Sequence, residues 1–264
     1  IAHATYASGK GLTGKLAWTP VREVVDALDR AFYLAFEAVE PANKRMLLAL
    51  DVSGSMTVGR VAGAPLTPRQ GAAAMALVTM ATEPQTHCVA FAAKGKQSWT
   101  SPFDSRWSGF TDGLTPLAIS PKQRLDDVVK AMDGLPFGGT DCALPMLYAL
   151  DQNLKVDAFV VYTDSETWAG KVHPSEALRR YRAETGIAAK LVVVGMVANN
   201  FSIADPKDAG MLDVVGFDAS AAEKLRRWVS GGGTLILVDG ALRWAMGEAI
   251  GLVPTDRREV PVPP

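Results

Sequence analysis

The chain has 264 residues, of which 48% are hydrophobic and 21% are charged, and this composition supplies enough apolar surface for a sizeable core. Its 27 basic and 28 acidic side chains leave a net charge of -1. This balance excludes a strong global attraction to nucleic acid or to an anionic membrane, so any such binding needs a local patch.

The two cysteines and the absence of long apolar runs predict the compartment. Cys88 and Cys142 lie in apolar surroundings without the spacing of a metal site, so we expect reduced core thiols. The sequence shows no secretory leader and no run of about 18 apolar residues, so we expect that it contains neither a signal peptide nor a membrane span. We therefore expect a cytoplasmic protein.

The first residues resemble a phosphate-binding loop without fulfilling its chemistry. Residues 9–16 nearly match the P-loop pattern, but Leu16 stands where a Mg²⁺-binding hydroxyl is needed. No apolar strand precedes Gly9, so the strand-to-helix frame is missing as well. We interpret residues 1–18 as a basic flexible loop. Thr19 and Pro20 then predict the N-cap and first residue of a helix that ends before Pro41.

The next segment is an apolar run, residues 46–50, that ends in oxygen-bearing side chains. In an extended chain, alternate side chains point to one side, so Asp51, Ser53 and Ser55 can converge. Three oxygens with no Cys or His nearby favour Mg²⁺ or Mn²⁺ over Zn²⁺. Asp and Ser also make turns and caps at many strand ends, so this motif needs partners from elsewhere in the chain.

Alternating helices and strands are predicted after this turn. Thr67 and Gln70 have the spacing of a capping box at the start of a buried, alanine-rich helix. The remaining predicted elements in this stretch are a strand over 87–92, a possible antiparallel strand over 97–101, a surface loop over 103–116 and a helix over 124–132.

Two more oxygen clusters follow. A Gly-rich turn carries Thr140 and Asp141 into a helix over 143–150, and the apolar strand 158–162 ends at Thr163 and Asp164. Either cluster alone would be interpreted as a helix cap. Ligands collect at the carboxyl ends of strands in parallel α/β sheets, so three such clusters together favour one metal site.

The rest of the chain keeps the same alternation. We expect a helix over 174–185, strands over 190–195 and 211–215, and a helix over 219–229. The predicted fold class is therefore α/β, a doubly wound, mostly parallel sheet with helices on both faces. His173 lacks a paired thiol or base and is interpreted as structural. The arginines at 179, 180 and 182 are interpreted as a solvated face, with phosphate contact as the alternative.

Together the three clusters resemble the metal-ion-dependent adhesion site of von Willebrand factor A domains. Longer stretches are similar to one branch, the von Willebrand A-like domain of the Ro (TROVE) ribonucleoprotein autoantigen family, and we expect a bacterial member. These stretches are Ala31–Tyr33 with Val39–Pro41, Leu47–Met56, Gly138–Met146, Val172–Pro174, Gly195–Met196, Ile203–Pro206 and Gly216–Asp218. The resemblance covers residues 19–227 and implies a von Willebrand A, Rossmann-like fold.

The resemblance also implies a function. The metal ligands would be Asp51, Ser53, Ser55, Thr140 and Asp164, with a position left for the carboxylate or phosphate oxygen of a partner protein or RNA. Asp141 and Glu166 would support the ligands or cap helices. The parent family binds Y RNA and misfolded noncoding RNA, chiefly through a ring of helical repeats that these 264 residues do not contain. No catalysis by this domain is implied.

Three segments and two rival functions complete the sequence-based picture. The segments are residues 1–44, a loop and linking helix; 45–229, the A-like domain; and 230–264, an extra βα unit with a Pro-rich tail that the resemblance does not cover.

One rival function is that of a Mg²⁺-dependent phosphatase of the haloacid dehalogenase type. That chemistry needs a general acid two residues after the nucleophilic Asp51, where this chain has Ser53. The other is a scaffold with a vestigial metal site.

Overall fold

The computed structural model describes residues 2–11, 15–61, 65–92, 113–133, 135, 139–165, 170–197 and 203–214. The chain divides into two compact units, residues 1–216 and 217–264. All the described residues belong to the first unit. The elements predicted over 97–101, 219–229 and 230–264 lie outside the described residues.

A six-stranded sheet forms the centre of the first unit, and its strand order is β3-β2-β1-β4-β5-β6. The strands are β1 (Arg45–Asp51), β2 (Gln85–Phe91), β3 (Leu114–Pro116), β4 (Ala158–Thr163), β5 (Lys190–Gly195) and β6 (Met211–Val214). Only β3 is antiparallel to its neighbour. This mostly parallel sheet confirms the predicted fold class, and the predicted bounds of β5 are confirmed as well.

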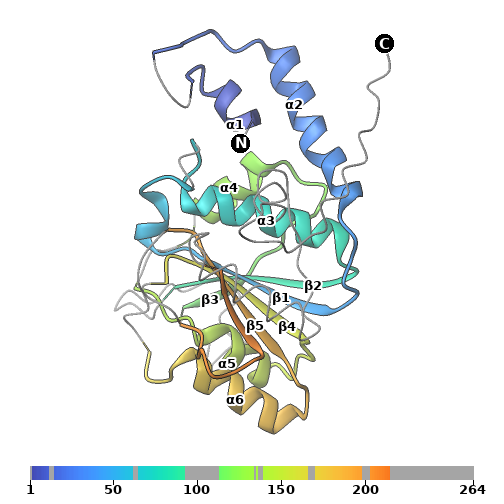
Figure 1. Cartoon of the computed structure of the whole chain (residues 1–264), viewed down its shortest axis with the longest axis vertical. Coiled ribbons are helices and arrows are strands. Elements are labelled where there is room, and N and C mark those ends of the chain that lie inside the picture. The colour runs from blue at the N-terminus through green and yellow to red at the C-terminus, as the bar shows by residue number, and fades with distance from the viewer. Residues whose placement is uncertain are drawn as a thin grey trace, which may run out of the picture. The chain divides into compact units, whose positions relative to one another are not determined.

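Helices cover both faces of this sheet (Figure 1). The helices are α1 (Ala2–Ala7), α2 (Arg22–Leu34), α3 (Pro68–Thr82), α4 (Leu125–Asp133), α5 (Leu144–Asp151) and α6 (Pro174–Thr185), with 3₁₀ turns η1 (Ala35–Ala38) and η2 (Gly54–Thr57). In Figure 1, α3 and α4 lie on one face and α5 and α6 on the other. None of the described helices has both the length and the apolar character needed to cross a membrane.

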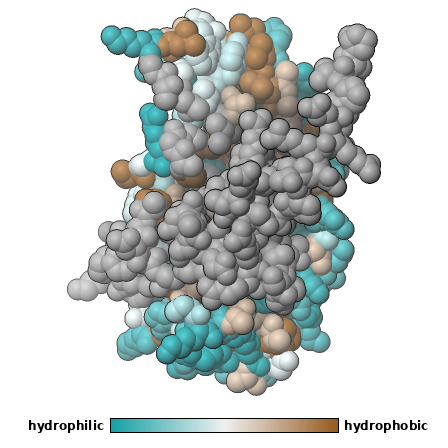
Figure 2. Space-filling view, in the orientation of Figure 1, coloured by the Kyte–Doolittle hydropathy of each residue, from teal (hydrophilic) through white to brown (hydrophobic). Residues whose placement is uncertain are grey.

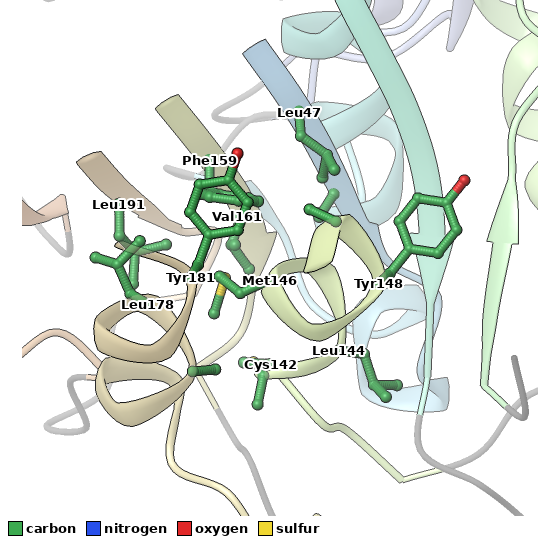
Figure 3. Packing of buried hydrophobic residues seen from close by; sticks show 14 of the residues in the cluster. Leu47, Cys142, Leu144, Met146, Tyr148, Phe159, Val161, Leu178, Tyr181 and Leu191 are labelled. Carbon is green, nitrogen blue, oxygen red and sulfur yellow. The ribbon is translucent and has the colours of Figure 1, made fainter. Parts of the chain in front are cut away.

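Alternation along β1 divides the core into two clusters. Leu48 and Leu50 pack in the cluster that also contains apolar residues of α3 and α4. Leu47 and Ala49 belong to the other cluster, which contains residues of α5 and α6 such as Met146 and Tyr181; Figure 3 shows part of this cluster. Because both faces of β1 are covered, the strand is apolar from Met46 to Leu50, between Arg45 at its start and Asp51 at its end.

Two of the sequence predictions for loops were wrong. Residues 2–7 form the helix α1, which is fixed by Trp18: its indole Nε1 donates to Tyr6 O at 2.9 Å and its ring stacks on that of Tyr6. Residues 114–116 form the edge strand β3, which pairs with β2 from Val89 to Phe91. Both elements depend on contacts with distant residues, and local patterns do not carry that information.

The helix predicted from Thr19 begins later. In the structure Val21 is the N-cap of α2, and no side chain caps the helix. The backbone N–H groups of Val24 and Val25 both donate to Val21 O, which starts the helix at Arg22. Within the described residues, α2 buries none of its side chains, and hydrophobic residues reach the surface in this part of the molecule (Figure 2).

The capping box predicted at the start of α3 is present. Thr67 Oγ1 accepts from Gln70 N at 3.2 Å, and Gln70 Oε1 accepts from Thr67 N at 2.9 Å. These bonds satisfy donors that the helix itself cannot. They fix the start of the helix that follows the oxygen-rich turn.

Replacing Thr67 tests this cap. We expect Thr67→Ala to lower the free energy of unfolding by about 0.5–2 kcal/mol, because the Gln70 N–H loses its acceptor. Chemical denaturation measures the change. The matched control is Thr82→Ala in the last turn of α3, where the hydroxyl only bonds helix carbonyls and the expected change is smaller. Equal effects of the two substitutions would contradict the role of the cap.

Candidate metal centre

The register of the two central strands brings the first and third oxygen clusters together. β1 and β4 are parallel neighbours, and Leu50 is aligned with Tyr162. Asp51 therefore lies beside Thr163, and the Thr163 hydroxyl donates to Asp51 Oδ2 at 2.7 Å. The connections after β1 and β4 lead to helices on opposite faces of the sheet, which is the arrangement that opens a crevice at strand ends.

Asp51 is fully buried at this edge. Ser53 N donates to its Oδ1 at 2.8 Å, so both carboxylate oxygens accept a hydrogen bond. Burial is the main reason why the pKa of Asp51 is raised to about 6, and the negative charge of Asp164 acts in the same direction against the hydrogen bonds of Ser53 and Thr163. Two carboxylates thus share a buried region where a cation would be favoured.

The turn after β1 adds hydroxyl oxygens. Ser53 Oγ and Ser55 Oγ lie 3.1 Å apart, and Ser53 is buried while Ser55 is exposed. The convergence predicted for Ser53 and Ser55 is therefore present, although the strand ends at Asp51 and the chain forms the 3₁₀ turn η2 from Gly54. An exposed hydroxyl beside buried carboxylates gives the cluster access from solvent.

The second cluster approaches from the start of α5. Thr140 is buried, and two residues later Cys142 Sγ lies 3.8 Å from Thr163 Oγ1, which places this segment next to β4. Asp141 Oδ1 accepts from Ala143 N at 3.0 Å, but Ala143 is the N-cap of α5 and no side chain caps this helix, so the capping alternative for Thr140 or Asp141 was wrong. A side chain at Gly170 would collide with this carboxylate, which accounts for the glycine.

Ser165 provides a further test of whether the cluster fits a cation. Its φ is 64°, in the left-handed region, and Ser165 N donates to Thr163 Oγ1 at 3.1 Å. Ser165 Oγ is buried and has no hydrogen-bond partner within the described residues. A buried hydroxyl without a hydrogen-bond partner lowers the stability of the fold unless a water molecule or an ion interacts with it. Oxygen donors, two carboxylates and this hydroxyl therefore fit Mg²⁺ or Mn²⁺ and not a thiophilic metal.

Other predicted candidates have structural roles. His173 Nδ1 accepts from Ser175 N as the N-cap of α6. Arg179 and Arg180 pair with Glu176 on the helix surface, and Arg182 pairs with Asp208. These contacts agree with the structural interpretation of the histidine and with a solvated face for Arg179 and Arg180. Glu166 lies outside the described residues.

Sequence reasoning missed two residues that shape the site. Thr163 was noted only as part of a cluster, although its position beside Asp51 follows once β1 and β4 are paired. Arg69 is 1% exposed and donates to the backbone carbonyls of Val52 and Ser53. The signal for it is an arginine in the first turn of an otherwise apolar, buried helix, where a charge requires partners.

With this geometry in place, comparison with known proteins identifies the family. The sequence model described as Ro60 vWA domain matches residues 45–229. The chain belongs to this family. It is 50% identical to "RNA-binding protein RO60" of Deinococcus radiodurans over 231 residues, and 43% identical to "RNA-binding protein RO60" of Caenorhabditis elegans over 231 residues. Both relatives are named as RNA-binding proteins and not as enzymes.

A solved structure agrees with this membership of the Ro60 vWA family. The crystal structure of the Deinococcus radiodurans RO (RSR) protein matches with a TM-score of 0.69 at 50% identity, over 87% of this chain and 43% of that chain. The sequence matches cover 87% of this chain but 40% and 33% of the two relatives. The chain thus spans less than half the length of the curated relatives it matches.

The raised pKa of Asp51 makes metal-free stability depend on pH. Its pKa of about 6 in the folded state exceeds the ordinary value, so folding favours the protonated form, and stability is lost as the pH rises from about 4 to 6. With a chelator present, we expect the free energy of unfolding of the wild type to fall by on the order of 2–3 kcal/mol over this pH interval, relative to that of the Asp51→Asn variant, which cannot titrate at this position. Denaturation at several pH values measures the difference, and a pH-independent difference would refute it.

Proposed function

We propose that this chain is the metal-binding domain of a Ro-type RNA-binding protein. A Mg²⁺ or Mn²⁺ ion is held by Asp51, Ser53, Ser55, Thr140 and Asp164, and it leaves a position for an oxygen of a partner. When bound, the ion neutralises the two carboxylates and attracts a carboxylate or phosphate group. The domain binds and does not break bonds.

The observation that carries this proposal is the buried carboxylate at the end of β1. Asp51 is fully buried beside Asp164, which disfavours two negative charges unless a cation accompanies them. The adjacent hydroxyls of Ser53 and Ser55 are neutral oxygen donors. Mg²⁺ suits such a set because it accepts few carboxylates and retains water ligands, one of which a partner can replace.

The relatives support RNA binding in general, and the biological setting is part of the proposal. Their names state RNA binding, and we infer that this protein takes part in noncoding RNA quality control and binds Y RNA and misfolded RNA. RNA contact is expected mainly in the part of the relatives that this chain does not span. The burial of Cys88 and Cys142 is compatible with a cytoplasmic setting, which belongs to the same proposal.

Metal binding is tested by stability. Mn²⁺ or Mg²⁺ should raise the thermal midpoint and a chelator should lower it, with a gain of about 2.7 kcal/mol when the free ion reaches 100 times its dissociation constant. We expect Asp51→Asn to abolish this gain, because the neutral amide cannot balance the charge of the ion. Thermal unfolding with and without the metal measures it.

The matched control is Asp157→Asn. Asp157 pairs with Arg45 at the opposite end of the same strand, so its loss lowers stability without touching the proposed ligands. We expect the Asp157→Asn variant to keep the full metal-induced shift. A shift in Asp51→Asn as large as that in the wild type would refute the ligand assignment.

RNA binding by this chain alone should be weak. With a net charge of -1 the chain offers little counterion release, so we expect dissociation constants no tighter than the range of about 10⁻⁴–10⁻⁶ M typical of non-specific binding. Gel-shift titrations with structured RNA at several salt concentrations measure this. A tight complex with a steep salt dependence would overturn this part of the proposal.

A further inference from the structure

Arg69 lies directly behind the turn that carries the proposed metal ligands. It is in the first turn of α3, and its side chain is 1% exposed. Nη2 donates to Val52 O at 2.9 Å and to Ser53 O at 3.3 Å, and Nη1 donates to Asp133 Oδ1 at 2.8 Å. One guanidinium therefore joins the turn after β1 to the last residue of α4.

The backbone N–H and C=O groups of Val52 and Ser53 are all hydrogen-bonded. Val52 N donates to Phe91 O at 2.9 Å, and Ser53 N donates to Asp51 Oδ1 at 2.8 Å. Both carbonyls accept from Arg69, and Ser53 O also accepts from Met56 N at 3.2 Å. Because the N–H and C=O of both Val52 and Ser53 are engaged, the direction of the Ser53 side chain is set before any ion binds.

We infer that Arg69 is a positioning residue for metal binding, which acts by holding the Val52 and Ser53 carbonyls and does not touch the ion. This inference rests on the proposed function. The planar fork of arginine can reach two carbonyls and a carboxylate at once, whereas lysine offers a point charge. A purely packing role would be filled better by an apolar side chain, since burying a guanidinium is costly.

The energetic benefit is preorganisation. A mobile turn would lose conformational freedom when Ser53 and Ser55 orient toward an ion, and that loss would weaken binding. The contacts of Arg69 restrict the turn in the metal-free protein already. Removal of residues that orient metal ligands typically costs 10–100-fold in affinity, and we expect a loss of this size for Arg69.

The test compares Arg69, which contacts the turn after β1, with Arg45, which lies at the start of β1. Mn²⁺ affinity is measured by electron paramagnetic resonance for the wild type, Arg69→Met and Arg69→Lys, with Arg45→Met and Arg45→Lys as matched controls. Arg45 also forms an ion pair with an aspartate, but at the opposite end of β1. Hydrogen exchange of the Ser53 and Met56 amides in the chelated protein reports on the turn itself, with the β5 amides as an internal reference.

We expect both Arg69 variants to bind Mn²⁺ about 10–100-fold more weakly, and the Arg45 variants to lose stability only. Exchange at Ser53 and Met56 should accelerate relative to β5 in the Arg69 variants alone. If Arg69→Met does not fold, Arg69→Lys, which retains the charge, decides. Wild-type affinity in a folded Arg69 variant would overturn the inference. Failure of the wild type to bind Mn²⁺ would overturn the proposed function. Unchanged hydrogen exchange at Ser53 and Met56 in the Arg69 variants would independently refute the claim that Arg69 restricts the turn.

Discussion

A carboxylate buried at the end of the central strand is the constraint on which the site depends. Asp51 has lost its hydration, and its two hydrogen bonds, from Ser53 N and Thr163 Oγ1, only partly offset that loss. The nearby charge of Asp164 adds to the cost. A fold that retains such a pair needs a proton or a cation there, and the oxygen-rich surroundings favour a hard cation.

Packing of the sheet keeps Asp51 buried despite this energetic cost. Asp51 extends a strand with neighbours on both sides and helices on both faces, so it cannot move into solvent without disrupting the core. Thr163 belongs to the adjacent strand and is equally fixed. Ligands carried by rigid elements keep their geometry better than ligands on long loops. The same packing that stabilises the fold therefore holds the two carboxylates close together.

Local sequence patterns predicted the elements whose signals are local. The bounds of α6 and β5 and the capping box of Thr67 and Gln70 followed from periodicity and capping chemistry. The strand β3 was missed because an edge strand of three residues exists only through its pairing with β2. Helix α1 depends in the same way on Trp18, a contact across 12 residues.

The residues of the candidate site also differ in whether a local sequence pattern indicates them. The oxygens of Asp51, Ser53 and Asp164 could be predicted because each follows an apolar strand or lies in its turn, and parallel strands bring their carboxyl ends to one edge. For Arg69 the sequence indicates only that a buried charge needs partners, since its contacts with Val52, Ser53 and Asp133 arise only when α3 and α4 pack beside the turn. The proposed ligand residues leave a pattern in the sequence, while the contacts of the proposed positioning residue exist only in the tertiary structure.

These two groups of residues have opposite effects on the stability of the metal-free protein. The contacts of Arg69 stabilise the turn, whereas the proximity of Asp164 destabilises the charged form of the Asp51 carboxylate. Asp51 lies in β1 and Asp164 directly follows β4, so packing of the sheet keeps the two carboxylates close together. Their repulsion therefore persists until a proton or cation enters, and its relief would favour binding of a cation. A proton competes with the cation for the same carboxylate, and affinity should therefore fall as the pH drops below the pKa of Asp51, about 6.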